Sequence, residues 1–121
     1  MLLVTSNKVK QLLCISYIGQ VRREEFRSSR GDLTMQLKEL SPGFRLLADF
    51  SQMASMGLEC APELGRMMDL IGRADVGLVV RVIPEPSRDI GMNIMTVFHY
   101  PHRPRVVNCH NLTEAVGLLE L

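Results

Sequence analysis

The sequence lacks several features that would assign it to common functional classes. It has no Trp, and its 3 Cys are odd in number and show no paired metal spacing, which excludes a disulfide framework and fits a reducing compartment. A net charge of +1 provides no general attraction for nucleic acid or for an anionic membrane. No apolar run approaches the roughly 20 residues that a membrane helix needs. These absences favour an intracellular globular protein with neither a nucleic-acid partner nor a membrane span.

The composition that remains is that of one globular domain. Hydrophobic residues make up 46% of the 121 residues and charged residues 22%, so residues 1–121 are expected to fold around a single core. With only 4 Phe and 2 Tyr, the 8 Met must supply part of the packing. The first five residues have no signal-peptide character, and we predict a cytoplasmic location.

Strand and helix patterns alternate along the chain. Apolar runs between turn residues predict five strands, at Met1–Thr5, Gln11–Val21, Arg45–Phe50, Val76–Ile83 and Arg105–Cys109. Helical spacing predicts helices at Arg22–Leu40, Glu59–Arg73 and Arg88–Phe98, and a last helix after the capping-box spacing Asn111-Leu-Thr-Glu114. The first of these helices is expected to have a kink or break at Gly31-Asp32. The order is ββαβαβαβα. It predicts an α/β fold with a mostly parallel five-stranded sheet, about four helices, and a hairpin whose first strand is the edge.

Two finer expectations concern how the helices cover this sheet. If the strands run in sequence order, right-handed crossovers place every helix on the same face. In the last helix, Ala115, Val116, Leu118 and Leu119 are expected to face inward. The other face would then be solvated or would form a partner interface.

The segment from Phe44 to Pro62 is the centre of the functional argument. It is interpreted as a buried strand, then a polar turn over Ser51–Gly57, then the start of a helix. In a parallel sheet such a corner lies at the carboxyl edge, where binding sites usually form.

The element order, the run Ser-Pro-Gly-Phe-Arg-Leu-Leu-Ala-Asp-Phe-Ser and the corner Ser-Met-Gly-Leu together resemble the STAS or SpoIIAA-like family. This family includes anti-sigma factor antagonists and the cytoplasmic tails of sulfate transporters. The resemblance covers nearly the whole chain in topology, and it is specific in residues only around Leu46–Leu58. The family motif, Asp-Ser-Ser/Thr-Gly-Leu, corresponds to residues 54–58 here, with Ala54 in place of Asp and Met56 in place of the second hydroxyl residue.

The resemblance implies a non-enzymatic regulatory or protein-interaction module whose partner is another protein. In the antagonists a partner kinase phosphorylates the first Ser of the motif, which corresponds to Ser55. The alternative is that Ser55 simply caps the helix or turn. The fold is also similar to that of CRAL-TRIO lipid-transfer domains, so a small-molecule module for an apolar, lipid-like or anionic ligand is a second hypothesis.

Polar residues at the carboxyl edge of the predicted sheet form a candidate binding rim. Its members are Asp49, Ser51, Ser55, Gly57, Glu85, Ser87, Arg88 and Asn111. Asp49 and Arg81 are charged residues inside apolar strands, and they would form a cross-strand pair if they share a face. Such a pair would belong either to a solvated face or to an interface.

A weaker hypothesis is an enzyme that uses Cys109 or His110, as a thiol beside its base. His99, His102, Cys109 and His110 have side chains that suit zinc, but the predicted fifth strand separates them by about 16 Å, so we predict no metal site. No cofactor is predicted. Homodimerisation is a further prediction, from the Met-containing helices and the uncovered sheet face.

Overall fold

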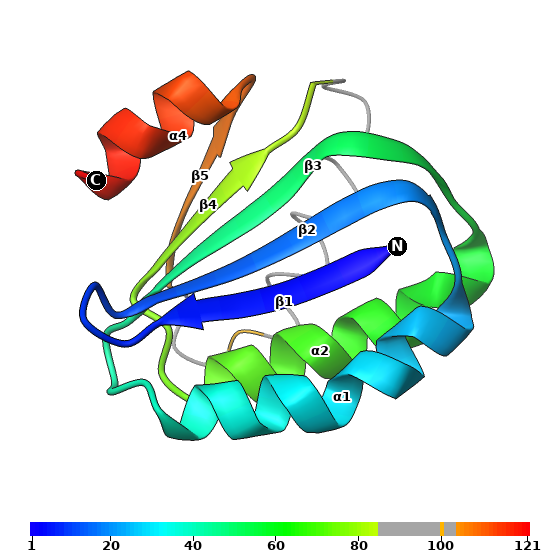
Figure 1. Cartoon of the computed structure of the whole chain (residues 1–121), viewed down its shortest axis with the longest axis horizontal. Coiled ribbons are helices and arrows are strands. Elements are labelled where there is room, and N and C mark those ends of the chain that lie inside the picture. The colour runs from blue at the N-terminus through cyan, green and yellow to red at the C-terminus, as the bar shows by residue number, and fades with distance from the viewer. Residues whose placement is uncertain (85–99, 101–103) are drawn as a thin grey trace.

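The structure is a computed structural model of the chain, and it describes residues 1–84, 100 and 104–121. One sheet of five strands, in the order β1-β2-β3-β4-β5, runs through the molecule (Figure 1). The strands are β1 (Leu2–Asn7), β2 (Leu12–Val21), β3 (Arg45–Met56), β4 (Leu78–Val82) and β5 (Arg105–Cys109). The helices are α1 (Arg23–Lys38), α2 (Ala61–Arg73) and α4 (Leu112–Leu119), with a 3-10 turn η1 (Leu58–Cys60) before α2.

The predicted sheet topology is confirmed. β1 pairs with β2 in antiparallel fashion and forms the edge, and β2, β3, β4 and β5 are parallel. The hairpin turn lies later than predicted, because Ser6 and Asn7 still pair with Leu13 and Leu12. Gln11 closes the turn in the left-handed region at φ 50.

The face that α1 and α2 cover holds the larger core. Alternate residues of β2 and β3 point toward these helices, and Tyr17 stacks on Phe50 with ring centroids 4.1 Å apart. Figure 1 shows the two helices side by side beneath the sheet. The buried side chains that close this face are Leu13, Ile15, Leu46, Ala48 and Val79 from the strands, and Phe26, Leu33, Leu64, Met67, Met68 and Ile71 from the helices.

α1 corrects one prediction. It is continuous from Arg23 to Lys38, without the expected break at Gly31-Asp32. Phe26 and Leu33 are two turns apart on the buried side, so packing against the sheet and α2 holds the helix through the glycine. Gly31 and Asp32 are both exposed, so neither requires the helix to end.

α4 lies on the opposite face of the sheet, which corrects the expectation of a single covered face (Figure 1). α1 and α2 connect parallel strands and obey the crossover rule, but α4 follows the last strand and is not a crossover. Its Ala115 and Leu119 pack on Leu12, Val80, Val82 and Cys109. Val116 and Leu118, which were expected to face inward, are exposed because this short helix presents only a narrow buried stripe.

The predicted helix at Arg88–Phe98 lies outside the described residues. Among the residues that the structure describes, no helix is both long enough and apolar enough to cross a membrane.

Candidate functional site

The corner after β3 differs from its predicted form. β3 was expected to end at Phe50, but it continues to Met56, with Gln20 opposite Ser55 and Val21 opposite Met56. β4 ends at Val82, opposite Asp49, so beyond that point β3 pairs only with β2 among the described strands. Two register shifts with β2 accompany this extension, as expected where a strand bends. Ser51 and Ser55 therefore lie on a strand and not in a polar turn.

The chain then enters α2 through a tight turn. Gly57 precedes the single 3-10 turn Leu58–Cys60, the amide of Cys60 donates to the carbonyl of Gly57 at 3.0 Å, and α2 begins at Ala61. Gly57 and Cys60 hold the two N-cap positions, and no side chain caps either start. The alternative that Ser55 caps the helix or turn is therefore wrong, because Ser55 caps neither η1 nor α2. The thiol of Cys60 lies 3.6 Å from the carbonyl of Val21 and is buried, which anchors the turn to β2.

This corner presents a hydroxyl and a large apolar side chain to solvent. Ser55 and Gly57 are exposed, and Leu58 is 93% exposed. Met53 and Met56 of the same strand pack partly against the core. The backbone is thus held by strand pairing and by buried anchors, while Ser55 and Leu58 are accessible to another molecule.

The structure brings some residues of the predicted rim together and separates others. Asp49, Val82 and Cys109 are neighbours in register, and the amide of Ser51 donates to Asp49 Oδ1 at 2.9 Å. Asn111 follows Cys109, and its Oδ1 caps α4 by accepting from the amide of Glu114 at 2.9 Å.

Ser55 and Gly57 lie beyond this group. Ser55 is six residues past Asp49 on an extended strand, which corresponds to about 20 Å. Glu85, Ser87 and Arg88 lie outside the described residues. Among the described members, the rim therefore divides into a group around Asp49 and the separate corner at Ser55.

The predicted pair of Asp49 and Arg81 does not form. Ala48 is opposite Arg81 and Asp49 is opposite Val82, so the two charged side chains point to opposite faces of the sheet. Arg81 is buried on the face of α1 and α2, where its Nε donates to Asn108 Oδ1 at 2.7 Å. Asp49 lies on the face of α4.

Cys109 has the environment of a structural cysteine. Burial raises the pKa of its thiol, and the nearby carboxylates of Glu114 and Asp49 raise it further, so the thiol stays protonated at neutral pH. His110 is exposed, and its amide donates to Glu114 Oε2 at 3.2 Å. A protonated, buried thiol is a poor nucleophile, which argues against the enzyme hypothesis.

The metal interpretation has no support in the part of the chain that the structure describes, where no three His, Cys, Asp or Glu residues gather. His99 and His102 lie outside that part.

Two small cavities bear on the hypothesis of a small-molecule module. One, of about 20 Å³, lies between the sheet and α2 and includes Arg81 and Tyr100 in its lining. The other, of about 10 Å³, lies between α1 and α2. Each has room for about one water molecule, so neither accommodates a lipid-like ligand.

Comparison with known proteins identifies the fold. No family model matches the sequence, and no curated protein matches it either. Among solved structures, the anti-sigma factor antagonist SpoIIAA in its unphosphorylated form is 15% identical, with a TM-score of 0.62 over 99% of this chain and 98% of that chain. Bacillus SpoIIAA in the phosphorylated form is 11% identical, with a TM-score of 0.59 over 98% and 99%. An uncharacterised DUF3478 protein from Shewanella loihica PV-4 is 13% identical, with a TM-score of 0.72 over 98% and 92%.

The chain has the SpoIIAA-like fold. Within this SpoIIAA-like fold, sequence reasoning placed Ser55 and Gly57 in the candidate rim but did not single out the exposure of Leu58. The sequence does contain a signal for the exposure of Leu58. This leucine follows a glycine and lies outside the apolar stripe of the next helix, which consists of Leu64, Met67, Met68 and Ile71.

Proposed function

We propose that residues 1–121 form a single, non-enzymatic regulatory domain of the STAS type, which binds another protein through the corner Ser55–Cys60. The observation that carries this proposal is the position of Leu58, a large apolar side chain that is 93% exposed on a turn with buried anchors. Because buried neighbours already hold the backbone of this turn, binding through Leu58 would require little further ordering of the backbone. A cytoplasmic location and a homodimer stay predictions of the same proposal.

Ser55 is the residue through which this binding would be regulated. The solved relatives with the same fold include SpoIIAA in unphosphorylated and phosphorylated forms, and SpoIIAA is described as an anti-sigma factor antagonist. In this chain, the exposed Ser55 hydroxyl precedes Leu58 by three residues. A phosphate there would add a charge of roughly −1.5 to −2 beside an apolar contact, which disfavours burial of that contact against a partner.

Site-specific photo-crosslinking tests the proposed corner. A photoreactive amino acid at position 58 is compared with the same amino acid at position 9, because Val9 is 96% exposed but lies in the hairpin turn. We expect a discrete crosslinked protein in extracts of the native cells from position 58 and none from position 9. The crosslink should be lost in Ser55→Asp. Equal crosslinking from both positions, or crosslinking unchanged by Ser55→Asp, would contradict the binding corner or its regulation, respectively.

A further inference from the structure

Glu63 is a buried carboxylate that three arginines contact. It lies in the first turn of α2, and its side chain is 2% exposed. Its Oε1 accepts from Arg27 Nε at 3.2 Å and from Arg66 Nη1 at 2.8 Å, and its Oε2 accepts from Arg30 Nη2 at 2.7 Å. Arg27 and Arg30 belong to α1 and Arg66 belongs to α2. One carboxylate therefore joins the two helices and orders three guanidinium groups around it.

This cluster carries an excess of two positive charges, because three guanidinium groups surround a single carboxylate. Within the described part of the chain, no second carboxylate forms an ion pair with Arg27, Arg30 or Arg66. The three arginine side chains are 56%, 45% and 59% exposed, respectively. A guanidinium has five N–H donors, and each of these contacts with Glu63 uses one. Donors therefore remain on three accessible side chains.

Glu63 acts as a positioning residue for these donors. Although burial raises the pKa of a carboxyl group, hydrogen bonds from Arg27 and Arg66 lower the pKa of Glu63 below its ordinary value, so it is ionised at neutral pH. Its charge restricts three flexible side chains before any ligand arrives. Part of the conformational entropy that an arginine loses on binding is thus already lost in the free protein.

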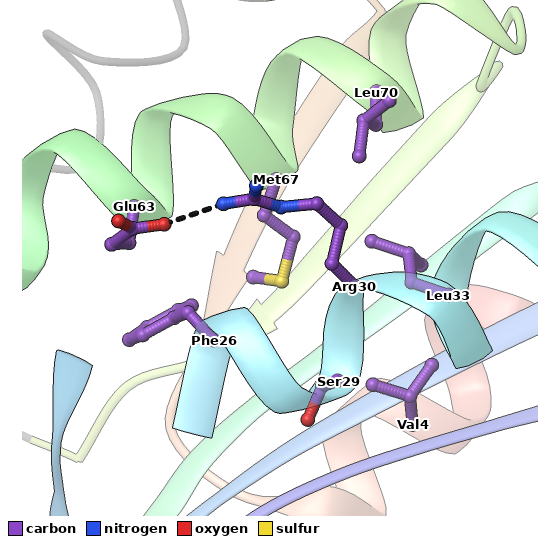
Figure 2. A pocket seen from close by; sticks show the side chains of 8 residues that line it. All are labelled: Val4, Phe26, Ser29, Arg30, Leu33, Glu63, Met67 and Leu70. Carbon is purple, nitrogen blue, oxygen red and sulfur yellow. Dashed lines mark hydrogen bonds and ion pairs between the residues drawn. The ribbon is translucent and has the colours of Figure 1, made fainter. Parts of the chain in front are cut away.

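Figure 2 shows two members of this cluster, Glu63 and Arg30, at the gap between the two helices. Arg30 extends from α1 to Glu63 on α2, and Phe26, Leu33 and Met67 lie nearby as apolar lining. The cavity among them measures about 10 Å³ and accepts nothing larger than a water molecule. A ligand would therefore contact the outer donors of the arginines and would not enter the gap.

We propose that Arg27, Arg30 and Arg66 form a binding site for a phosphate monoester group. The planar fork of arginine matches pairs of phosphate oxygens, and charge-assisted hydrogen bonds of this kind are strong. A phosphate monoester carries a charge of roughly −1.5 to −2 near pH 7, which matches the excess of two positive charges, whereas a carboxylate neutralises only one. The group belongs either to a phosphorylated side chain of a partner protein or to a free phosphate compound.

Titration of the full chain, followed through the arginine side-chain Nε–H signals by NMR, tests this site. The probes are inorganic phosphate, a short phosphoserine peptide, and the same peptide with glutamate at that position, all at constant ionic strength. We expect Arg66→Gln to weaken phosphate binding about tenfold, as the loss of a charged hydrogen bond implies. The matched control is Arg73→Gln, which removes one positive charge from the same helix. Arg73 pairs with Asp69, outside the cluster, and its side chain is 72% exposed. The control should weaken binding less than about twofold.

The pH dependence provides a second readout. Arginine stays charged throughout, while the second proton of a phosphate monoester has a pKa near 6, so binding should weaken several-fold from pH 7.5 to pH 5. Tighter binding of the phosphoserine peptide than of inorganic phosphate would assign the source to a partner protein, and equal binding would assign it to free phosphate.

Three results would overturn the site. They are the absence of a phosphate-dependent shift of the arginine signals, equal losses of phosphate affinity in Arg66→Gln and Arg73→Gln, and a glutamate peptide that binds as tightly as the phosphoserine peptide. Thermal unfolding of both variants at pH 7 checks that each is folded. The phosphate titration depends on the three arginines and the crosslinking test depends on position 58, so a failure of this site is distinguishable from a failure of the proposed corner.

Discussion

The described helices cover the two faces of the sheet to very different extents. α1 and α2 cover one face across the strands, and the aromatic pair Tyr17 and Phe50 lies in its core. On the other face, the part of the chain that the structure describes places one helix, the eight-residue α4, which packs on β3, β4 and β5. Outward residues of the hairpin, such as Leu3 and Thr5, stay exposed. This difference indicates that most of the stability comes from the first face, while the second has surface that is free for other contacts.

The largest expected effect comes from a matched pair of core truncations, Leu64→Ala and Leu119→Ala, which compares the stability that each face contributes. Both leucines are buried, the first in α2 and the second in α4. Leu64 lines the cavity of about 20 Å³, so its truncation enlarges an existing void and should destabilise the fold by about 3–4 kcal/mol. Leu119 lies in the smaller of the two core clusters, on an eight-residue helix that can readjust. Its truncation should cost about 2 kcal/mol.

Urea unfolding monitored by circular dichroism measures both values. The conservative variants Leu64→Met and Leu119→Met should each cost less than about 1.5 kcal/mol. Equal losses for the two alanine variants would show that the small helix contributes as much as the larger core, and the comparison of faces would then be wrong.

A smaller effect on stability is expected from Glu63→Gln, at the outer side of the face that α1 and α2 cover. The pKa of Glu63 is lowered in the folded state, so its stabilising contribution is present above the unfolded pKa of about 4.3 and is lost as the pH falls through the folded value. The variant should therefore melt below the wild type at pH 7. This difference should narrow below about pH 4.5.

Thermal melts between pH 7 and pH 3 measure this narrowing. Asp69→Asn is the matched control, because Asp69 also pairs with an arginine of α2 but is itself 38% exposed. The control should show little difference at any pH. A wild type and a Glu63→Gln variant that melt in parallel across this range would rule out the charge of Glu63 as a link between the helices.

Much of the architecture was predictable because local signals agreed with the final structure. The predicted fifth strand, Arg105–Cys109, matches β5, and the capping-box spacing at Asn111 marks the start of α4. The end of β3 was not predictable in the same way. Ser51, Gln52 and Ser55 have the composition of a turn, but the long strand β2 provides backbone partners for this segment. Tertiary pairing thus overrides local propensity here.

The side-chain clusters depended on information that a single sequence does not contain. Whether Asp49 and Arg81 meet is decided by a shift of one residue in register, and nothing in either strand specifies that shift. Glu63 and Arg66 have a recognisable helical spacing, but Arg27 and Arg30 come from another helix. Their meeting depends on how α1 packs against α2. The sequence therefore predicts the sheet well and the charged sites poorly.

The smallest expected effect concerns the order in which the three cysteines react with a thiol reagent. Burial raises the pKa of Cys14, Cys60 and Cys109, so all three are mainly protonated at pH 8 and accessibility decides their rates. Cys14 is half-buried on the incompletely covered face and should react first. Cys109 should follow through local opening of α4, and Cys60, in the larger core, should react only on global unfolding. Mass spectrometry of alkylated peptides over time measures this order. If Cys60 reacts as fast as Cys109, the two faces open together. The face with more helix cover would then be no more stable toward local opening than the other.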